Sequence, residues 1–335
     1  MSWRIVGHER PAALLERALT SDQLSHAYLL SGPEGIGKRT LALELASAAL
    51  CVGDSSDAAP CRACPSCARI ETNNHPDFRL VELDAERVQI SRQEIGRIQR
   101  DVALKPLVGT RKVYVLIEVE RLSPVAGNQL LKLLEEPPPG VIFVLTTADV
   151  GAVLPTITSR CQVVRMQPVS RETIAAHLSA DAGVDSEAAR LIAEVADGRI
   201  GWAIRAGADP ALLQARESAM DDLLQLLQSE RLDRLLKSQE LAARWYSDRA
   251  SVLDELDWWA RALRDLAVQA AVPNAVSVAS RGHEALSALS GQFSASASIE
   301  AARAAQHTAL LLEQNVHPRI ALDTLVIDLP TIHTR

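Results

Sequence analysis

Short runs of apolar and β-branched residues alternate with stretches of helical periodicity over roughly the first half of the chain. Most of the runs are almost continuously apolar, as expected of parallel strands that are covered on both faces. The alternation therefore predicts an α/β domain built on a five-stranded parallel sheet. The predicted strands span residues 27–31, 78–83, 113–117, 141–146 and 163–166.

One predicted helix, between the third and fourth strands, has well-marked ends. Ser123 can cap its N-terminus, and Pro124 suits its first turn. Residues 137–140, Pro-Pro-Pro-Gly, stop it, so that Glu135 and Glu136 close the helix.

Beyond residue 167 the strand pattern ceases. Residues 168–208 predict a small lid of two or three short helices, broken at Gly183 and Gly198. Residues 209–335 carry apolar positions at three-and-four spacing, which predicts an all-helical third domain. Within it, the Ala- and Ser-rich stretch 274–298 predicts short helices or a loose connection. We therefore expect three domains, 1–167, 168–208 and 209–335.

Composition sets limits on the class of protein. With 335 residues, 47% of them hydrophobic, the chain can bury a large core. No apolar stretch approaches the roughly 20 residues that span a bilayer, and the N-terminal residues lack the order of a signal peptide, so we expect a cytoplasmic protein without a membrane partner. A net charge of −7 argues against a protein that wraps DNA alone, because non-specific DNA affinity comes mostly from Lys and Arg.

A glycine-rich loop follows the first predicted strand and leads into a helical pattern. It spans residues 32–40, Gly-Pro-Glu-Gly-Ile-Gly-Lys-Arg-Thr, which is nearly a Walker A sequence. Gly32, Gly35 and Gly37 allow backbone N–H groups to curl around phosphate oxygens, and Lys38 would reach the outer phosphates. The order of strand, loop and helix favours a nucleotide-binding fold over a glycine-rich turn without chemistry.

Two residues expected to hold magnesium are missing. The position after Lys38 is Arg39 instead of the Ser or Thr that ligates the ion, and Thr40 lies about 100° further round the helix. Ile117 stands where an aspartate would end the third strand, although Glu118 remains. ATP binding at this loop stays open, whereas hydrolysis is not expected. The alternative is a shifted register in which Glu118 or a neighbouring glutamate approaches the metal.

Four cysteines cluster after the loop helix, three of them with C-x2-C-x2-C spacing. Four thiolates suit a closed structural zinc site, which leaves no open position for a substrate. An iron–sulfur cluster would need a further cysteine at position 71, which is Glu71. Free thiols, and a site with His75 in place of Cys51, also compete with the zinc interpretation, and the lone Cys161 is expected in the core. The four candidate ligands are Cys51, Cys61, Cys64 and Cys67.

With these residues identified, the chain resembles the bacterial DNA polymerase III clamp-loader subunits of the AAA+ class over essentially its whole length. Besides the cysteine set, the resemblance rests on residues 5–8 (IVGH), 25–33 (SHAYLLSGP), 128–138 (NQLLKLLEEPP) and 154–161 (LPTITSRC). The family implies a P-loop AAA+ domain, a helical lid and a helical collar domain, within a pentameric spiral that opens a sliding clamp and places it on primed DNA.

Within that family the chain is closer to the non-hydrolysing delta-prime class than to the motor class, gamma or tau. The motor keeps a Walker A hydroxyl, a Walker B aspartate and a lid arginine, where this chain has Arg39, Ile117 and Gly201, with Arg199 close to the last. The resemblance implies as partners gamma or tau, delta, the sliding clamp and, through the assembled complex, primed DNA.

The resemblance also assigns a role to Arg160. In the family the arginine of the Ser-Arg-Cys triplet is the finger that reaches the γ-phosphate held by an adjacent subunit, and its fixed planar charge suits that task. An ordinary surface arginine is the alternative. Thr146 or Thr147 occupies the sensor position, and we expect it to be structural.

Two other functions compete with this prediction. The chain could be a clamp-loader motor that hydrolyses ATP with Lys38 and Glu118. It could instead be a zinc-dependent DNA-binding module, but only Arg62 and Arg69 lie close to the cysteines and no aromatic residues are interleaved with them. We therefore expect a subunit that supplies Arg160 in trans and hydrolyses no ATP of its own.

Overall fold

The computed structural model describes residues 3–53, 59–83, 87, 89–272, 284–289 and 292–331. The chain divides into two compact units. The first comprises Met1–His177 with Gly198–Trp202, and the second comprises Leu178–Asp197 with Ala203–Arg335. Among the helices of these described ranges, none is long and apolar enough to cross a membrane.

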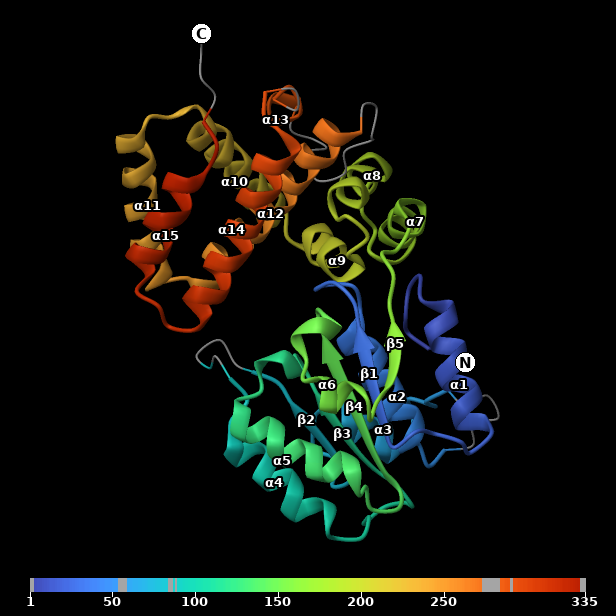
Figure 1. The fold of residues 1–335 in the computed structure, drawn as a ribbon. Coiled ribbons are helices and arrows are strands. Elements are labelled where there is room, and N and C mark those ends of the chain that lie inside the picture. The colour runs from blue at the N-terminus through green and yellow to red at the C-terminus, as the bar shows by residue number, and fades with distance from the viewer. Residues whose placement is uncertain are drawn as a thin grey trace. The chain divides into compact units, whose positions relative to one another are not determined.

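The first unit is built on a sheet of five parallel strands in the order β2-β3-β4-β1-β5 (Figure 1). The predicted five-stranded parallel α/β fold is thus confirmed. The strands are β1 (Ala27–Ser31), β2 (Phe78–Val81), β3 (Lys112–Leu116), β4 (Val141–Thr147) and β5 (Gln162–Arg165).

Several predicted strand ends were wrong by one or two residues. β2 ends at Val81 instead of residue 83, because its pairing with β3 covers only Phe78–Val81. β3 begins at Lys112, which pairs with Val141, and it ends before Ile117. β4 extends to Thr147, which pairs with Ser31, and β5 lies one residue earlier than predicted. Pairing with neighbours, which apolar runs do not reveal, decides where each strand stops.

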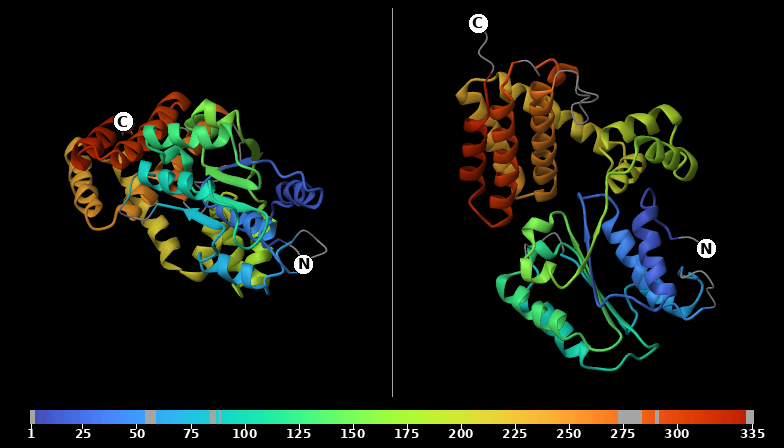
Figure 2. Two further views of the ribbon diagram at one scale, coloured as in Figure 1. Left: turned by 90° about the horizontal axis from the view of Figure 1, so that it is seen from below. Right: turned by 45° about the vertical axis from the view of Figure 1, so that its right-hand side comes forward.

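Two hydrophobic clusters cover opposite faces of this sheet. Alternate residues of β1 belong to different clusters, Tyr28 and Leu30 to one, Ala27 and Leu29 to the other, as strand geometry requires. Two further views show the blue and the green helices on opposite sides of the sheet (Figure 2). The first cluster includes residues of α1 (Glu9–Thr20), α2 (Lys38–Ala49) and α3 (Pro65–Glu71), and the second of α4 (Arg92–Val102), α5 (Pro124–Glu135) and α6 (Pro155–Thr158).

Helix α5 begins and ends as predicted. Its N-cap is Ser123, whose Oγ accepts a hydrogen bond from the Ala126 N–H at 3.3 Å, and Pro124 occupies the first turn. Its last residue is Glu135, and the three prolines follow directly after Glu136. Ala126 near its start and Leu130, Leu133 and Leu134 towards its end are buried, so both halves of this helix pack against the core.

Three short helices occupy the predicted lid segment, α7 (Arg171–Asp181), α8 (Ser186–Val195) and α9 (Ile200–Ala208). The breaks fall at the predicted glycines: Gly183 and Gly198 have φ of 64° and 77°. At Gly198 an added Cβ would also lie 2.8 Å from Pro168 Cα, so both backbone conformation and space require glycine there.

The second unit is helical beyond the lid. Its helices are α10 (Ala211–Gln228), α11 (Arg231–Trp245), α12 (Arg249–Ala271), α13 (Glu284–Ser287), α14 (Ala295–Glu313) and α15 (Pro318–Asp328). Of the predicted loose stretch 274–298, residues 274–283, 290 and 291 lie outside the described residues, and the described part holds α13 and the start of α14.

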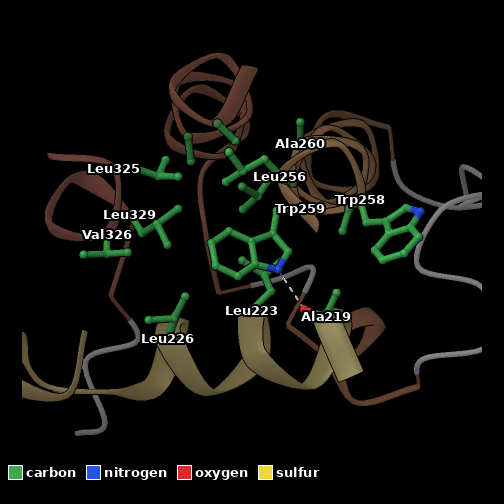
Figure 3. Packing of buried hydrophobic residues seen from close by; sticks show 14 of the residues in the cluster. Ala219, Leu223, Leu226, Leu256, Trp258, Trp259, Ala260, Leu325, Val326 and Leu329 are labelled. Atoms are coloured by element: carbon green, nitrogen blue, oxygen red, sulfur yellow. Dashed lines mark hydrogen bonds between the residues drawn. The ribbon is translucent and has the colours of Figure 1, made fainter. Parts of the chain in front are cut away.

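Trp259 lies at the centre of the core of this unit (Figure 3). The side chain of Trp259 is completely buried, and its indole Nε1–H donates to the Ala219 carbonyl of α10 at 2.8 Å. Figure 3 shows Leu223 and Leu226 of α10 and Leu325 of α15 around it. Trp259 therefore joins three helices through both packing and a satisfied polar group.

We predict that Trp259→Ala lowers the free energy of unfolding of the second unit by about 3–5 kcal/mol, because truncating a buried Trp leaves a cavity. Tyr246→Ala is the matched control, since Tyr246 is 71% exposed, and it should change stability by less than about 0.5 kcal/mol. Urea unfolding of the two variants measures the difference, and equal losses would contradict the central role of Trp259.

Candidate functional site

The glycine-rich loop stands at the carboxyl edge of the sheet, where it joins β1 to α2. Gly35 and Gly37 have φ of 73° and 108°, values that favour glycine. The predicted order of strand, loop and helix is present. Carbonyls of this loop already bind protein groups: Lys38 Nζ donates to Gly32 O at 2.5 Å and Pro33 O at 2.9 Å, and His8 Nε2 lies 2.7 Å from Ile36 O.

Lys38 carries the positive charge that would meet phosphates. Burial lowers the pKa of its ammonium group, and the nearby carboxylates Glu120, Glu34 and Glu118 act in the opposite direction. Negative charge therefore remains beside this lysine.

Arg39 binds Glu82, the residue immediately after β2. Its Nε donates to Glu82 Oε1 at 2.9 Å and its NH2 group to Oε2 at 3.0 Å. This two-pronged pair places a guanidinium at the start of α2, at the sequence position of the metal-binding hydroxyl. Thr40, one residue further, is exposed. The side chain at position 39 thus offers donors only and no ligand for a cation.

Glu118 stands at the end of β3 in a left-handed conformation, with φ 58° and ψ 59°. Its backbone N–H donates to Thr146 Oγ1 at 3.0 Å, and its carboxylate lies 3.1 Å from Arg121 Nε. Burial raises the pKa of the Glu118 carboxyl, which Arg121 partly offsets. Ile117 precedes it, so the strand end provides one ion-paired carboxylate and no aspartate.

The two threonines of β4 make different contacts. Thr146 fixes the backbone of Glu118, as described, while Thr147 Oγ1 donates to the Asp149 carbonyl at 2.8 Å. Glu120 Oε1 accepts from the Ala148 N–H at 2.8 Å, close to the same strand end. Both threonines thus hold backbone groups in place.

The start of α9 touches the glycine-rich loop through backbone atoms. The Gly201 N–H donates to the Gly35 carbonyl at 2.6 Å, and a Cβ at position 201 would lie 2.9 Å from that oxygen. Arg199 is 6% exposed, and its guanidinium lies 5.6 Å from the ring centroid of Trp202. A side chain at position 201 would require the backbone of Gly35 to move. The contact therefore leaves no room for an arginine at this position, where the resemblance places the lid arginine of the motor class. The sequence carried no signal for it.

The four candidate cysteines come together. Their sulfur atoms all lie within 4.8 Å of one another, and Cys51 Sγ is 4.0 Å from Cys64 Sγ. Sulfurs around one zinc ion would be about 3.8 Å apart, given Zn–S distances of about 2.3 Å. Cys64 also caps α3, and although burial opposes it, N–H groups of Cys67 and Val52 lower the pKa of its thiol to about 6. The donor set fits a closed tetrahedral metal site.

His75 does not belong to this cluster. Its Nε2 lies 3.2 Å from Ser66 Oγ, and its Nδ1 accepts from the Asp77 N–H at 3.1 Å. Both ring nitrogens are therefore engaged, which argues against His75 as a replacement for Cys51. Cys161 lies apart from the cluster, packed against the core of the sheet, and burial raises the pKa of its thiol to about 12.

An ion pair connects the cysteine segment to the loop helix. Arg62 donates to both carboxylate oxygens of Glu44, on α2, at 3.3 and 2.8 Å. The Arg4 backbone N–H donates to the same carboxylate at 2.9 Å. The conformation of the cysteine segment is thus linked to the helix that follows the glycine-rich loop.

Arg160 lies at the opposite edge of the sheet, two residues before β5 begins. Its NH2 group is 2.7 Å from Glu135 Oε1, at the end of α5, and its NH1 group donates to Thr156 O at 2.9 Å. All five strands are parallel, so this edge and the edge that carries the glycine-rich loop lie at opposite ends of the strands. A strand of five residues is about 16 Å long, which is the approximate distance between the two edges. The structure does not bring Arg160 and Lys38 together.

Comparison with known proteins points to one family. The family described as "DNA polymerase III, delta subunit" matches residues 7–170. The Bacillus subtilis DNA polymerase III subunit delta' is 35% identical over 197 residues, which are 58% of this chain and 58% of that protein. The Haemophilus influenzae subunit tau/gamma is 38% identical over 178 residues, 52% of this chain and 25% of that protein. The chain thus matches less than two thirds of the length of either relative.

A solved structure from Thermotoga maritima, of a DNA polymerase III gamma subunit-related protein, is also similar. It is 18% identical, with 94% of this chain and 97% of that chain covered, at a TM-score of 0.45.

We predict that the purified chain holds one zinc ion and that Cys64→Ser removes it. Loss of the metal should lower the melting temperature of the first unit, because a structural zinc site contributes folding free energy directly. Cys161→Ser is the matched control and should keep both the metal and most of the stability. Elemental analysis with thermal unfolding measures both, and full zinc content in Cys64→Ser would show that the ion is bound elsewhere.

Proposed function

Since the chain belongs to the family of DNA polymerase III clamp-loader subunits, we propose that it acts as the delta-prime-type member. In this role it hydrolyses no ATP and supplies Arg160 to ATP held by a neighbouring subunit. The observation that carries the proposal is the ion pair of Arg39 with Glu82, which stands where a magnesium ligand would be needed.

Magnesium chemistry at the chain's own loop lacks its ligands. Mg²⁺ demands oxygen ligands in near-octahedral geometry, and ATP hydrolysis needs it to bridge the outer phosphates. Arg39 contributes positive charge instead of an oxygen, Ile117 contributes none, and Glu118 is paired with Arg121. The lid arginine of the motor class is missing as well, because position 201 is a glycine with no room for a side chain. Binding of ATP without hydrolysis remains compatible with Lys38 and the loop.

The place of Arg160 favours action on another subunit. It lies about one strand length from its own glycine-rich loop, further than an arginine side chain extends. Its side chain is 34% exposed, so a partner can reach it. An arginine supplied in this way stabilises charge on the transferring phosphoryl group.

The remaining parts fit a subunit of a larger assembly. We assign the cysteine cluster a structural zinc ion, because four protein ligands leave no open position. The division into an AAA+ domain (1–167), a lid (168–208) and a collar domain (209–335) belongs to the same proposal. So do the partners, namely gamma or tau, delta, the sliding clamp and primed DNA through the complex, and a place in the cytoplasm.

The second candidate is a motor subunit that hydrolyses ATP itself. It is favoured by the survival of Lys38 beside the carboxylates of Glu118 and Glu120, and by relatives named tau/gamma. A zinc-dependent DNA-binding module has less support, because Arg62, the basic residue inside the cysteine segment, binds Glu44.

We predict that Arg160→Ala lowers ATP turnover of the assembled loader by about 10³-fold or more, as expected of a lost arginine finger. Arg10→Ala, a change at an exposed arginine of α1, is the matched control. Turnover is measured with clamp and primed DNA, and size exclusion confirms that the complex still forms. Parent-like turnover in the Arg160 variant would refute the role of this residue.

We further predict that Lys38→Ala changes turnover of the assembled loader by less than about twofold, because the loop that it belongs to performs no hydrolysis. The measurement is the same steady-state assay. A loss as large as that of Arg160→Ala would favour the motor function.

A further inference from the structure

The guanidinium of Arg160 is held in place on two sides. Glu135 Oε1 lies 2.7 Å from NH2, while Thr156 O accepts from NH1 at 2.9 Å and Ser159 Oγ lies 3.4 Å from NH1. Of the five N–H donors of an arginine, Nε–H and one N–H of NH2 have no partner among the described residues. The group is therefore oriented and still has a donor to offer.

Glu135 is an unfavourable residue for the position that it occupies. It is the last residue of α5, where the partial negative charge of the helix C-terminus disfavours a carboxylate. Glu136, next to it, adds a second negative charge. Helix stability thus gives no reason for a glutamate here, and in the described part of the chain the ion pair with Arg160 is the specific contact that its carboxylate makes.

The pair also adds little to the stability of the fold. The side chains of Arg160 and Glu135 are 34% and 48% exposed, and water screens the attraction of ion pairs that it reaches in this way. The pair does restrict the conformation of the Arg160 side chain. A free arginine side chain samples many rotamers and loses that freedom when it binds a phosphate. An arginine that is already held in place has lost part of this freedom beforehand, so binding costs it less entropy.

We propose that Glu135 is a positioning residue for Arg160, which it orients toward the phosphates of ATP in the neighbouring subunit. This inference rests on the proposed function. Glu135 comes from a helix that is capped by Ser123 and packed through Leu133 and Leu134, so the core of the first unit fixes the backbone position from which its carboxylate reaches Arg160. It touches no nucleotide and acts only through the arginine.

The test compares ATP turnover of the assembled loader, with clamp and primed DNA, for Glu135→Gln, Glu135→Ala and Arg160→Ala. We expect each Glu135 variant to lower kcat roughly tenfold with little change in KM, because a misplaced finger weakens only the transition state. Glu136→Gln is the matched control: it removes the same charge one residue further, and it should leave kcat unchanged. The melting temperature of each variant should match that of the parent.

A double variant separates this proposal from the one that it rests on. If Glu135 acts through Arg160, Glu135→Ala should change kcat by less than about twofold in the Arg160→Ala background. A tenfold loss in both backgrounds overturns the positioning role. Parent-like kcat in both Glu135 variants overturns it too, and if Arg160→Ala has then lost turnover, the finger still stands. Normal turnover in Arg160→Ala refutes the finger, and the positioning role with it.

Discussion

An arginine paired with a glutamate stands where magnesium-dependent ATP hydrolysis would need an oxygen ligand, and the proposed division of labour depends on that pair. Arg39 and Glu82 are 43 residues apart and join the start of α2 to the end of β2. Arg39 is a cation and cannot bind a metal ion, and its bonds to Glu82 occupy the carboxylate of that residue as well. Three further features lie at the same edge of the sheet and also disfavour metal binding and hydrolysis there. They are Ile117, the Glu118–Arg121 ion pair and the contact of Gly201 with Gly35.

The two edges of the sheet consequently have different tasks in the proposed assembly. The carboxyl edge keeps the shape of a nucleotide site without its metal shell, and the amino edge presents Arg160. Helix α5 connects them, since its N-cap Ser123 follows shortly after Glu118 and Arg121, and its last residue, Glu135, lies beside Arg160. One element thus relates the position of Arg160, the proposed finger, to the strand end that would hold the metal.

The sequence predicted what local patterns encode. Apolar runs predicted all five strands, glycine spacing predicted the loop, and cysteine spacing predicted the cluster, because each pattern lies within one short stretch of the sequence. The bonds of Arg39 to Glu82, Gly201 to Gly35 and Arg160 to Glu135 join distant segments, and no periodicity indicates them. Strand ends were wrong where pairing decided them, as at Val81. One signal was available: two glutamates at a helix C-terminus indicate a cation nearby.

The most direct test of the division of labour is ATP turnover by the isolated chain at saturating Mg-ATP. We predict a rate no higher than that of Lys38→Ala measured under the same conditions, because neither protein has a working metal shell. Brisk turnover that disappears in Lys38→Ala would contradict this, since the chain would then be hydrolysing ATP at its own loop.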